Sequence, residues 1–178
     1  MISMLAAIAA LHPPVIVPAG EGEAVPVPFH PVRLLLSGRA SEGGVTFYEF
    51  EVPPESSGAP PHVHRSEDEY FYVLEGEVTL LDGEEAVTAG PGALAALTRG
   101  HQHAFWNAGE TPLKMLVMVS GENRFEDFFD ALVLALREEA PADGRAFGAL
   151  VGRVAVEHDI EMRPDALPEE ARPFYPVP

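Results

Sequence analysis

Two histidines and a glutamate stand close together in residues 60–76, a stretch that reads PPHVHRSEDEYFYVLEG. His62 and His64 are two residues apart, so in an extended strand both imidazoles point to the same face. Glu69 follows His64 by five residues, an odd offset that would place it on the opposite face of a straight strand. The polar run 65–68 must therefore turn or bulge if the three side chains are to converge. Imidazole nitrogens with a carboxylate oxygen suit a borderline divalent transition metal.

A second stretch supplies a further candidate ligand. Residues 91–107 read PGALAALTRGHQHAFWN and contain His103. His101 forms a second pair with His103 and could in principle be the ligand instead. A single pair of histidines on a polar strand face is more often solvated than metal-bound, so it is the presence of both stretches that favours a metal site.

The two stretches resemble the motifs of the cupin family. The first motif has His-x-His, then Glu and, after six intervening residues, Gly, and it falls on His62, His64, Glu69 and Gly76. The second motif falls on Gly92, Thr98, Gly100, His103 and Asn107. Two turn positions depart from the pattern: Ser56 stands where the first motif begins with glycine, with Gly58 nearby, and Thr98 stands where the second usually has proline.

The resemblance covers roughly residues 32–120 and implies one divalent transition metal ion per chain. The implied ligands are His62, His64, Glu69 and His103, because the family spacing to Asn107 favours His103 over His101. We expect His101 just outside the ligand set, with a position facing the substrate as the alternative. Three imidazoles and a carboxylate suit iron, manganese, nickel, cobalt, copper or zinc and do not distinguish among them.

Composition limits the partners of this protein. Its 178 residues are enough for one well-cored domain. A formal charge of −17 would repel polyanions, so we expect neither nucleic acid nor an anionic membrane as a partner. There is no cysteine for a disulfide or a thiolate metal site.

The apolar residues 1–11 are too short to span a membrane and lack the basic start of a secretory leader, which favours a cytoplasmic protein.

Short runs of strand-forming residues predict an all-β fold. Residues 32–52 have the pattern of a hairpin, and Gly-containing turns separate further short runs as far as Ser120. Many short strands without helices between them indicate an antiparallel sandwich or barrel. The cupin resemblance implies a jelly-roll β-barrel (double-stranded β-helix) with C-terminal α-helices. We therefore divide the chain into an N-terminal extension (1–31), a cupin barrel (32–120) and a helical tail that packs on the barrel (121–178).

The tail has helical periodicity in two places. After Asn123 and Glu126, which resemble a capping box, apolar residues follow at Phe125, Phe128, Phe129, Leu132 and Leu136. A second helix begins near Asp143 and carries Phe147, Leu150, Val151 and Val154. We interpret both stripes as packing surfaces, either on the barrel or at a subunit interface, and residues 164–178 as loop. The Phe125 stripe, residues 1–11 and exposed sheet edges together predict a homodimer.

The remaining histidines have no partner at ligand spacing. His12 and His30 lie in a proline-rich lead-in, and we interpret both as surface residues. His158 lies near the end of the second helix, where it would serve the helix terminus or the solvent.

The expected interior is apolar around the metal. If Glu69 faces inward, alternation turns Phe71 and Val73 inward as well, and Phe105 follows His103; with His101, these are the candidate cavity residues. Such a cavity favours a small, flat, largely apolar substrate. Most of these side chains could equally be ordinary barrel core.

The segment GENRFEDFF after the last strand resembles the quercetin dioxygenase-like group of cupins. This resemblance implies a metal-dependent oxidoreductase that uses O2 on a flavonol or another enolic aromatic substrate, with Glu69 as the catalytic residue that removes the substrate proton. Two alternatives stay open. One is a non-catalytic cupin that binds a metal or ligand. The other is a cupin isomerase of sugars, which would need a more polar cavity.

Overall fold

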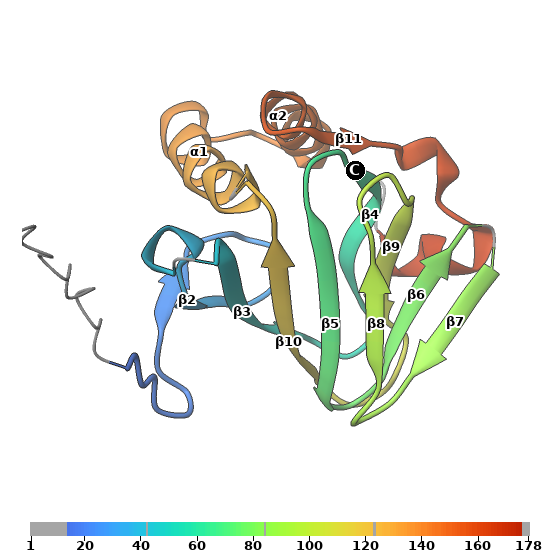
Figure 1. Ribbon diagram of the computed structural model, residues 1–178. Coiled ribbons are helices and arrows are strands. Elements are labelled where there is room, and N and C mark those ends of the chain that lie inside the picture. The colour runs from blue at the N-terminus through green and yellow to red at the C-terminus, as the bar shows by residue number, and fades with distance from the viewer. Residues whose placement is uncertain (1–13, 42, 84, 123, 176–178) are drawn as a thin grey trace, which may run out of the picture.

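Two antiparallel sheets form the body of the protein, and the computed structural model describes residues 14–41, 43–83, 85–122 and 124–175 (Figure 1). The first sheet has the strand order β1 (Glu23–Val25), β2 (Val32–Leu36), β3 (Val45–Val52), β10 (Leu113–Ser120), β5 (Asp68–Glu75) and β8 (Leu94–Leu97). The second has the order β11 (Ile160–Met162), β4 (Ser56–His64), β9 (His103–Asn107), β6 (Val78–Asp82) and β7 (Glu85–Ala89). The predicted all-β jelly-roll barrel is confirmed.

The barrel core lies between the two sheets. Along β10 every second residue is buried, and these inward residues are Leu113, Met115, Val117 and Val119. The alternation arises because successive side chains of a strand point to opposite faces. β2 and β3 pair antiparallel, with Val32 opposite Phe50, so the hairpin predicted for residues 32–52 is present. Its connection contains a short 3-10 helix, η1 (Gly38–Ala40).

Both predicted helices are present and lie across one end of the barrel (Figure 1). They are α1 (Arg124–Glu139) and α2 (Gly144–Glu157). Asp143 caps α2, because its side chain accepts a hydrogen bond of 2.8 Å from the backbone N–H of Ala146. The apolar stripe of α1 is buried within this same chain, with Phe129 only 4% exposed.

Glu126 connects α1 to the barrel. Asn123, its partner in the predicted capping box, lies outside the described residues, so the capping box stays a prediction. The buried carboxylate of Glu126 accepts hydrogen bonds from the Ser37 hydroxyl at 2.6 Å and from the Gly38 N–H and the Thr46 hydroxyl, both at 3.1 Å. These bonds attach α1 to the connection between β2 and β3. Glu126 therefore fixes the helix to the barrel.

The end of the chain is built into the second sheet. β11 pairs with β4 directly beside the two histidines, with Ile160 opposite His64 and Met162 opposite His62. The segment predicted to be loop contains two 3-10 helices, η2 (Pro164–Ala166) and η3 (Glu169–Phe174). Phe174 stacks on Trp106 of β9. Pairing and packing with distant strands order a segment that has no periodicity of its own.

Part of the segment before β2 forms an edge strand of the first sheet. β1 pairs with β2, and Ala24 lies opposite Arg33. Residues 1–13, including His12 and the apolar start of the chain, lie outside the described residues. None of the helices in the described ranges is long and apolar enough to cross a membrane.

Candidate metal centre

The end of β4 carries two of the predicted ligands. His62 and His64 lie on one face of the strand with ring centroids 4.9 Å apart. β4 ends at His64 and belongs to the second sheet, whereas Glu69 lies at the start of β5 in the first sheet. The intervening residues 65–67 cross from one sheet to the other. The turn that the odd spacing required is thus present, and it brings Glu69 to face His64.

β9 brings His103 to the same place from the second motif. In the pairing of β4 with β9, His103 lies opposite His62. A turn precedes β9, in which the His101 N–H donates to the Thr98 carbonyl at 3.0 Å and Gly100 has a φ of 81°. A positive φ at the third position of a turn favours glycine, so the turn forms with threonine in place of the usual proline.

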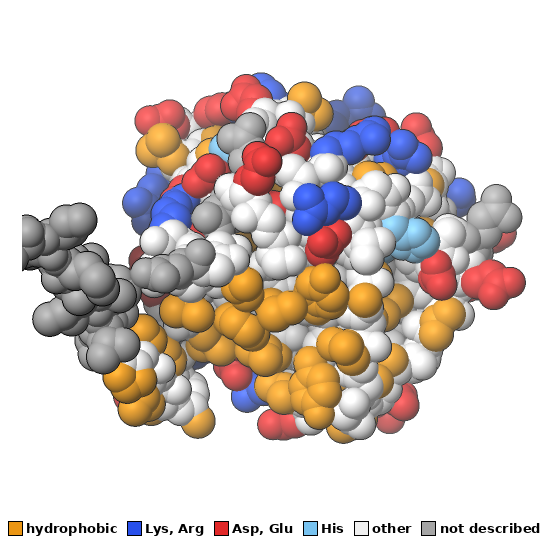
Figure 2. All heavy atoms as spheres, viewed as in Figure 1, with side chains coloured by type: hydrophobic (Ala, Val, Ile, Leu, Met, Phe, Trp, Pro, Cys, Tyr) orange, Lys and Arg blue, Asp and Glu red, His pale blue; other side chains and the backbone are white. Residues whose placement is uncertain are grey.

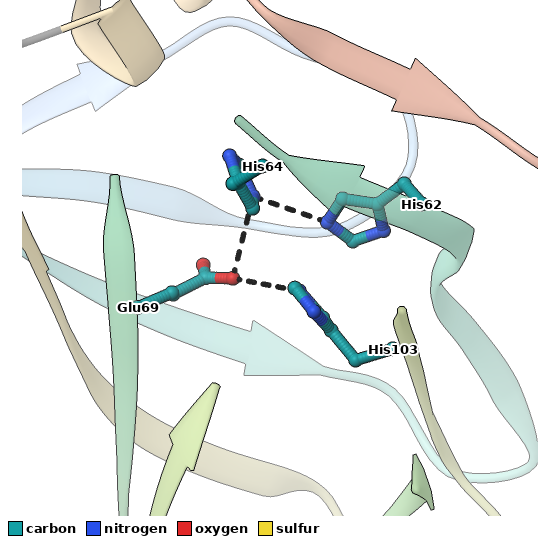
Figure 3. A group of neighbouring side chains, drawn as sticks. All are labelled: His62, His64, Glu69 and His103. Carbon is teal, nitrogen blue, oxygen red and sulfur yellow. Dashed lines mark hydrogen bonds and ion pairs between the residues drawn. The ribbon is translucent and has the colours of Figure 1, made fainter. Parts of the chain in front are cut away.

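Four donor atoms converge at this point (Figure 3). His62 Nε2 and His64 Nε2 are 3.2 Å apart, and Glu69 Oε2 lies 3.2 Å from His103 Nε2 and 3.6 Å from His64 Nε2. One ligand atom from each residue lies within 4.8 Å of all the others. Atoms bound at about 2.1 Å to one ion are separated by roughly 3 to 4.2 Å. The buried group of His62, His64, Glu69 and His103, hereafter the metal group, can therefore hold a metal ion.

Hydrogen bonds to the other ring nitrogens orient two of the imidazoles. His62 Nδ1 lies 2.8 Å from the Pro60 carbonyl, and His103 Nδ1 lies 3.2 Å from the His101 carbonyl. Because a carbonyl oxygen only accepts, each Nδ1 carries the proton of a neutral ring and each Nε2 offers a lone pair to an ion. Such backbone partners are typical of metal-bound histidines.

Burial and mutual contact set the charges of the group. Burial, together with the neighbouring imidazoles of His103 and His64, holds the pKa of His62 well below its usual range. Burial would raise the pKa of Glu69, but the neighbouring imidazoles of His103 and His64 outweigh this and lower that pKa well below the usual range. A neutral imidazole and an ionised carboxylate are the protonation states that a divalent ion requires.

Two further motif residues shape the barrel and do not touch the metal group. The buried amide of Asn107 donates to the carbonyls of Val52, Pro53 and Thr111 at 2.8–3.0 Å. Gly76 has a φ of 72°, and a Cβ there would collide with the carbonyl of Pro112. Both residues therefore hold the loop before β10, which lies beside the strand that carries Glu69.

A cavity of about 380 Å³ opens beside the metal group and is covered by the two C-terminal helices. Glu69 and His62 form part of its wall. Aromatic side chains form much of the rest: Phe29, Phe50, Phe105, Phe125, Phe128, Phe129, Phe147 and Tyr175. Phe125 also contacts His64, with ring centroids 5.2 Å apart. Because α1 and α2 supply four of these residues and Leu132 and Val151 as well, they line the candidate site.

A hydrogen bond joins helix α1 to the turn between His64 and Glu69. Glu67, in the turn between His64 and Glu69, is 1% exposed, and its Oε2 accepts a hydrogen bond of 2.8 Å from the backbone N–H of Phe125. The turn that positions Glu69 therefore also positions the start of α1 over the cavity.

Of the predicted cavity residues, only Phe105 lines this cavity. Phe71 and Val73 point inward but are buried in the barrel core, where the Phe71 ring packs edge-on against Phe105. His101 lies on the surface, with Nε2 3.0 Å from a carboxylate oxygen of Asp82. Alternation in a strand predicts which side chains face inward, but it does not predict which of them reach the open space.

Two interpretations of the sequence require correction. His30, predicted to be a surface residue, is 5% exposed and lines the cavity with Phe29. The helix stripes, predicted to be packing surfaces only, form the cavity wall. A helical stripe indicates that a face is apolar but not what it covers, and the proline-rich lead-in has no period from which burial could be inferred. His158 is the C-cap residue of α2, as its position near the helix end indicated.

Comparison with known proteins agrees with this geometry. The family model of the cupin domain matches residues 48–119, which include both metal-binding stretches. The chain belongs to the cupin family. The polyketide cyclase RemF from Streptomyces resistomycificus is 30% identical, over 58% of this chain and 70% of its own, with a TM-score of 0.46.

Two other solved cupin structures are similar at lower identity. A predicted oxalate decarboxylase from Thermotoga maritima is 26% identical over 52% of this cupin and 80% of its own chain, with a TM-score of 0.47. A sugar phosphate isomerase of the cupin superfamily from Silicibacter pomeroyi is 26% identical over 51% and 60%, with a TM-score of 0.45. None of the curated proteins matches this sequence.

Proposed function

We propose that this cupin is a metal-dependent dioxygenase that acts on a flavonol or another enolic aromatic substrate with O2. The observation that carries the proposal is the position of the metal group: three histidines and a glutamate form one polar point in the wall of an apolar, largely aromatic cavity. Cavities of about 300–1,000 Å³ accept small organic ligands. Flat aromatic rings match the Phe50 and Phe105 side chains in shape and polarity.

The composition of the cavity wall supports a neutral, largely apolar substrate. Among the described residues, the wall contains no Lys, Arg, Asn or Gln. A sugar phosphate would need cations for its phosphate and several amide or hydroxyl partners for its sugar. The cupin isomerase of sugars is therefore less well supported than the dioxygenase.

Glu69 is the proposed acceptor of the substrate proton. Its Oε2 faces His64 and His103 (Figure 3), and the residue forms part of the cavity wall. A carboxylate can both bind a metal ion and accept a proton, and it can change between these roles by rotation of its side chain. A divalent ion bound by the four residues would supply Lewis-acid polarisation of the enolic oxygen. The residues of the chain bind and orient the substrate and accept its proton at Glu69.

The covered cavity favours reaction with oxygen over reaction with water. Helices α1 and α2 line the cavity with apolar side chains such as Phe125, Phe129 and Phe147, and apolar walls exclude water from a reactive enolate. O2 is the oxidant and the substrate the reductant, so both oxygen atoms enter the products and no external reductant is needed.

Oxygen consumption tests the proposal. Purified protein would first be analysed for its metals, and a metal-free sample would then be reloaded with each divalent ion separately. Oxygen uptake would be measured with flavonols and 1,3-diketones, with the metal-free protein as the control. Uptake by a loaded sample above that control is expected. If no loaded sample consumes oxygen with any of these compounds, the dioxygenase is wrong and the non-catalytic ligand-binding cupin is the better account.

A further inference from the structure

His30 is a buried polar side chain in a part of the cavity wall that the metal group does not occupy. It lies in the segment between β1 and β2, and its ring packs against Phe29, Phe50 and Phe105 at centroid distances of 5.0, 5.1 and 6.2 Å. Among the described residues, none of its ring contacts is with His62, His64 or His103. His30 therefore offers the cavity a second polar point, which is surrounded by aromatic side chains and has no ring contact with the metal group.

The hydrogen bonding of His30 defines which nitrogen is available. Nδ1 lies 3.3 Å from the carbonyl oxygen of Pro31. A carbonyl only accepts, so Nδ1 carries the ring proton and Nε2 has a lone pair. Burial lowers the pKa of His30 to about 4, and the ring is therefore neutral near pH 7.

The Nε2 lone pair has no partner within the described protein. Nδ1 accounts for the only hydrogen bond of the ring in these ranges, and Nε2 is not one of the fully enclosed polar atoms that lack a partner. Because the side chain lines the cavity, a molecule in the cavity can reach this atom. The lone pair of Nε2 is therefore available to accept a hydrogen bond from a ligand that donates one.

We propose that His30 is a second anchor for the substrate, whose Nε2 accepts a hydrogen bond from a hydroxyl group remote from the end that faces the metal group. The inference rests on the proposed function and narrows its substrate class. The substrate is an aromatic molecule with two polar points, an enolic oxygen at the Glu69 end and a phenolic hydroxyl at the His30 end. The aromatic wall, including Phe50 and Phe105, contacts the rings between them.

Equilibrium binding without oxygen tests this assignment separately from turnover. The probes are 3-hydroxyflavone, its 3′- and 4′-hydroxy derivatives and the matching methoxy derivatives, which have the same oxygen but no proton to donate. Dissociation constants for the metal-loaded protein would be measured anaerobically by calorimetry. Wild type should bind at least one hydroxy probe roughly 3- to 10-fold more tightly than its methoxy counterpart, the effect of one hydrogen bond.

Substitutions at His30 assign the effect to this residue. His30→Phe keeps the aromatic packing and removes the acceptor, so it should abolish the preference for hydroxy over methoxy probes. His30→Gln keeps an acceptor and should retain part of the preference. His101→Phe, at a surface histidine, is the matched control and should leave the preference unchanged. Circular dichroism would establish that each variant is folded, and the comparison of hydroxy with methoxy probes in wild type needs no variant.

The outcomes separate the two proposals. If wild type prefers a hydroxy probe and His30→Phe keeps the same preference, His30 is not the anchor, although the substrate class stands. If wild type shows no preference for hydroxy over methoxy probes, the second anchor is likewise wrong. If wild type binds none of the flavonols, the proposed substrate class fails and the assignment of His30 fails with it.

Discussion

His62 and His103 lie directly opposite each other on the neighbouring strands β4 and β9, with ring centroids 4.3 Å apart. The pairing of two strands thus sets the distance between ligands that are far apart in the sequence. Glu69 reaches the same point from the other sheet. A metal ion held by all three would connect the two sheets of the barrel, in addition to any chemistry it supports.

Removal of any one ligand should reduce metal content. We predict one divalent ion per chain in wild type, and loss of metal from the Ala variants of His62, His64, Glu69 and His103, measured by elemental analysis after dialysis. Outer-shell changes typically weaken metal binding about 10- to 100-fold, so the loss of a ligand should weaken it at least as much. His101→Ala, the control, should retain the ion. Equal metal content in His103→Ala and wild type would contradict the ligand assignment.

Glu69→Gln should separate binding from chemistry. The amide keeps the shape and an oxygen ligand but cannot accept the substrate proton. We expect the variant to retain some metal and to bind flavonols while turnover falls roughly 10²- to 10⁴-fold, the usual range for loss of a general base. Oxygen uptake and anaerobic binding, measured on the same metal-loaded sample, provide the check. Turnover like that of wild type would rule out Glu69 as the base.

Gly58→Ala should narrow the cavity. A Cβ at Gly58 would collide with the ring of Phe105, which would have to move. Overpacking of this kind costs about 1–3 kcal/mol of unfolding free energy, and flavonol binding should weaken while metal content stays the same. Urea unfolding and calorimetry measure the two effects. Gly90→Ala is the control, because its nearest neighbour would be 3.9 Å away; the same behaviour in both variants would contradict the prediction.

His30 should make the protein less stable in acid. Its pKa is about 4 in the folded protein, where its ring neighbours are Phe29, Phe50 and Phe105, and 6.5 is the ordinary value. Between these values the unfolded chain binds a proton that the folded protein does not, so the free energy of unfolding falls as pH decreases through this window. The loss should be about 2 kcal/mol at pH 5.

Urea unfolding of wild type and His30→Phe at pH 7.5 and pH 5 measures this contribution. The other titrating groups are common to both proteins, so the wild type should lose about 2 kcal/mol more than the variant on acidification. The same pH dependence in both proteins would show that His30 is not buried in its neutral form.

The homodimer stays a prediction, but one of its arguments is wrong. The Phe125 stripe is buried within the chain and leaves no apolar face on that side of α1, and residues 1–11 lie outside the described residues. A different surface supports the prediction. Hydrophobic side chains gather over β10, β5 and β8 in Figure 2, and Tyr72, Leu74 and Leu94 are 43%, 39% and 65% exposed. Contiguous apolar surface of this kind commonly marks an interface.

Light scattering at micromolar concentration should give the mass of two chains of 19.2 kDa each. Leu94→Arg should reduce the mass to that of one chain, because it places a charge in the apolar face. Leu134→Arg changes an exposed leucine of α1 and should leave the dimer intact. A mass of one chain for wild type would contradict the homodimer.

The local pattern of the sequence indicated an antiparallel sandwich or barrel, and the resemblance to the cupin motifs implied its jelly-roll form and the four candidate ligands. A strand has a period of two, so His62 and His64 share a face, and the odd offset to Glu69 required the turn that the structure contains. The family motif then identified His103, although His101 also matched a two-residue spacing. Helices α1 and α2 were predictable for the same reason, because their apolar residues repeat with a helical period.

Only the tertiary structure decided what surrounds the metal group. The spacing of apolar residues along a helix or strand shows which of its faces is apolar, but what that face contacts depends on how distant segments pack. Phe125 and Phe129 therefore looked like packing residues and form a cavity wall, while Phe71 looked like a cavity residue and is core. His30 lies in an irregular segment, and its burial follows from contacts with Phe50 and Phe105, which come from two different sheets.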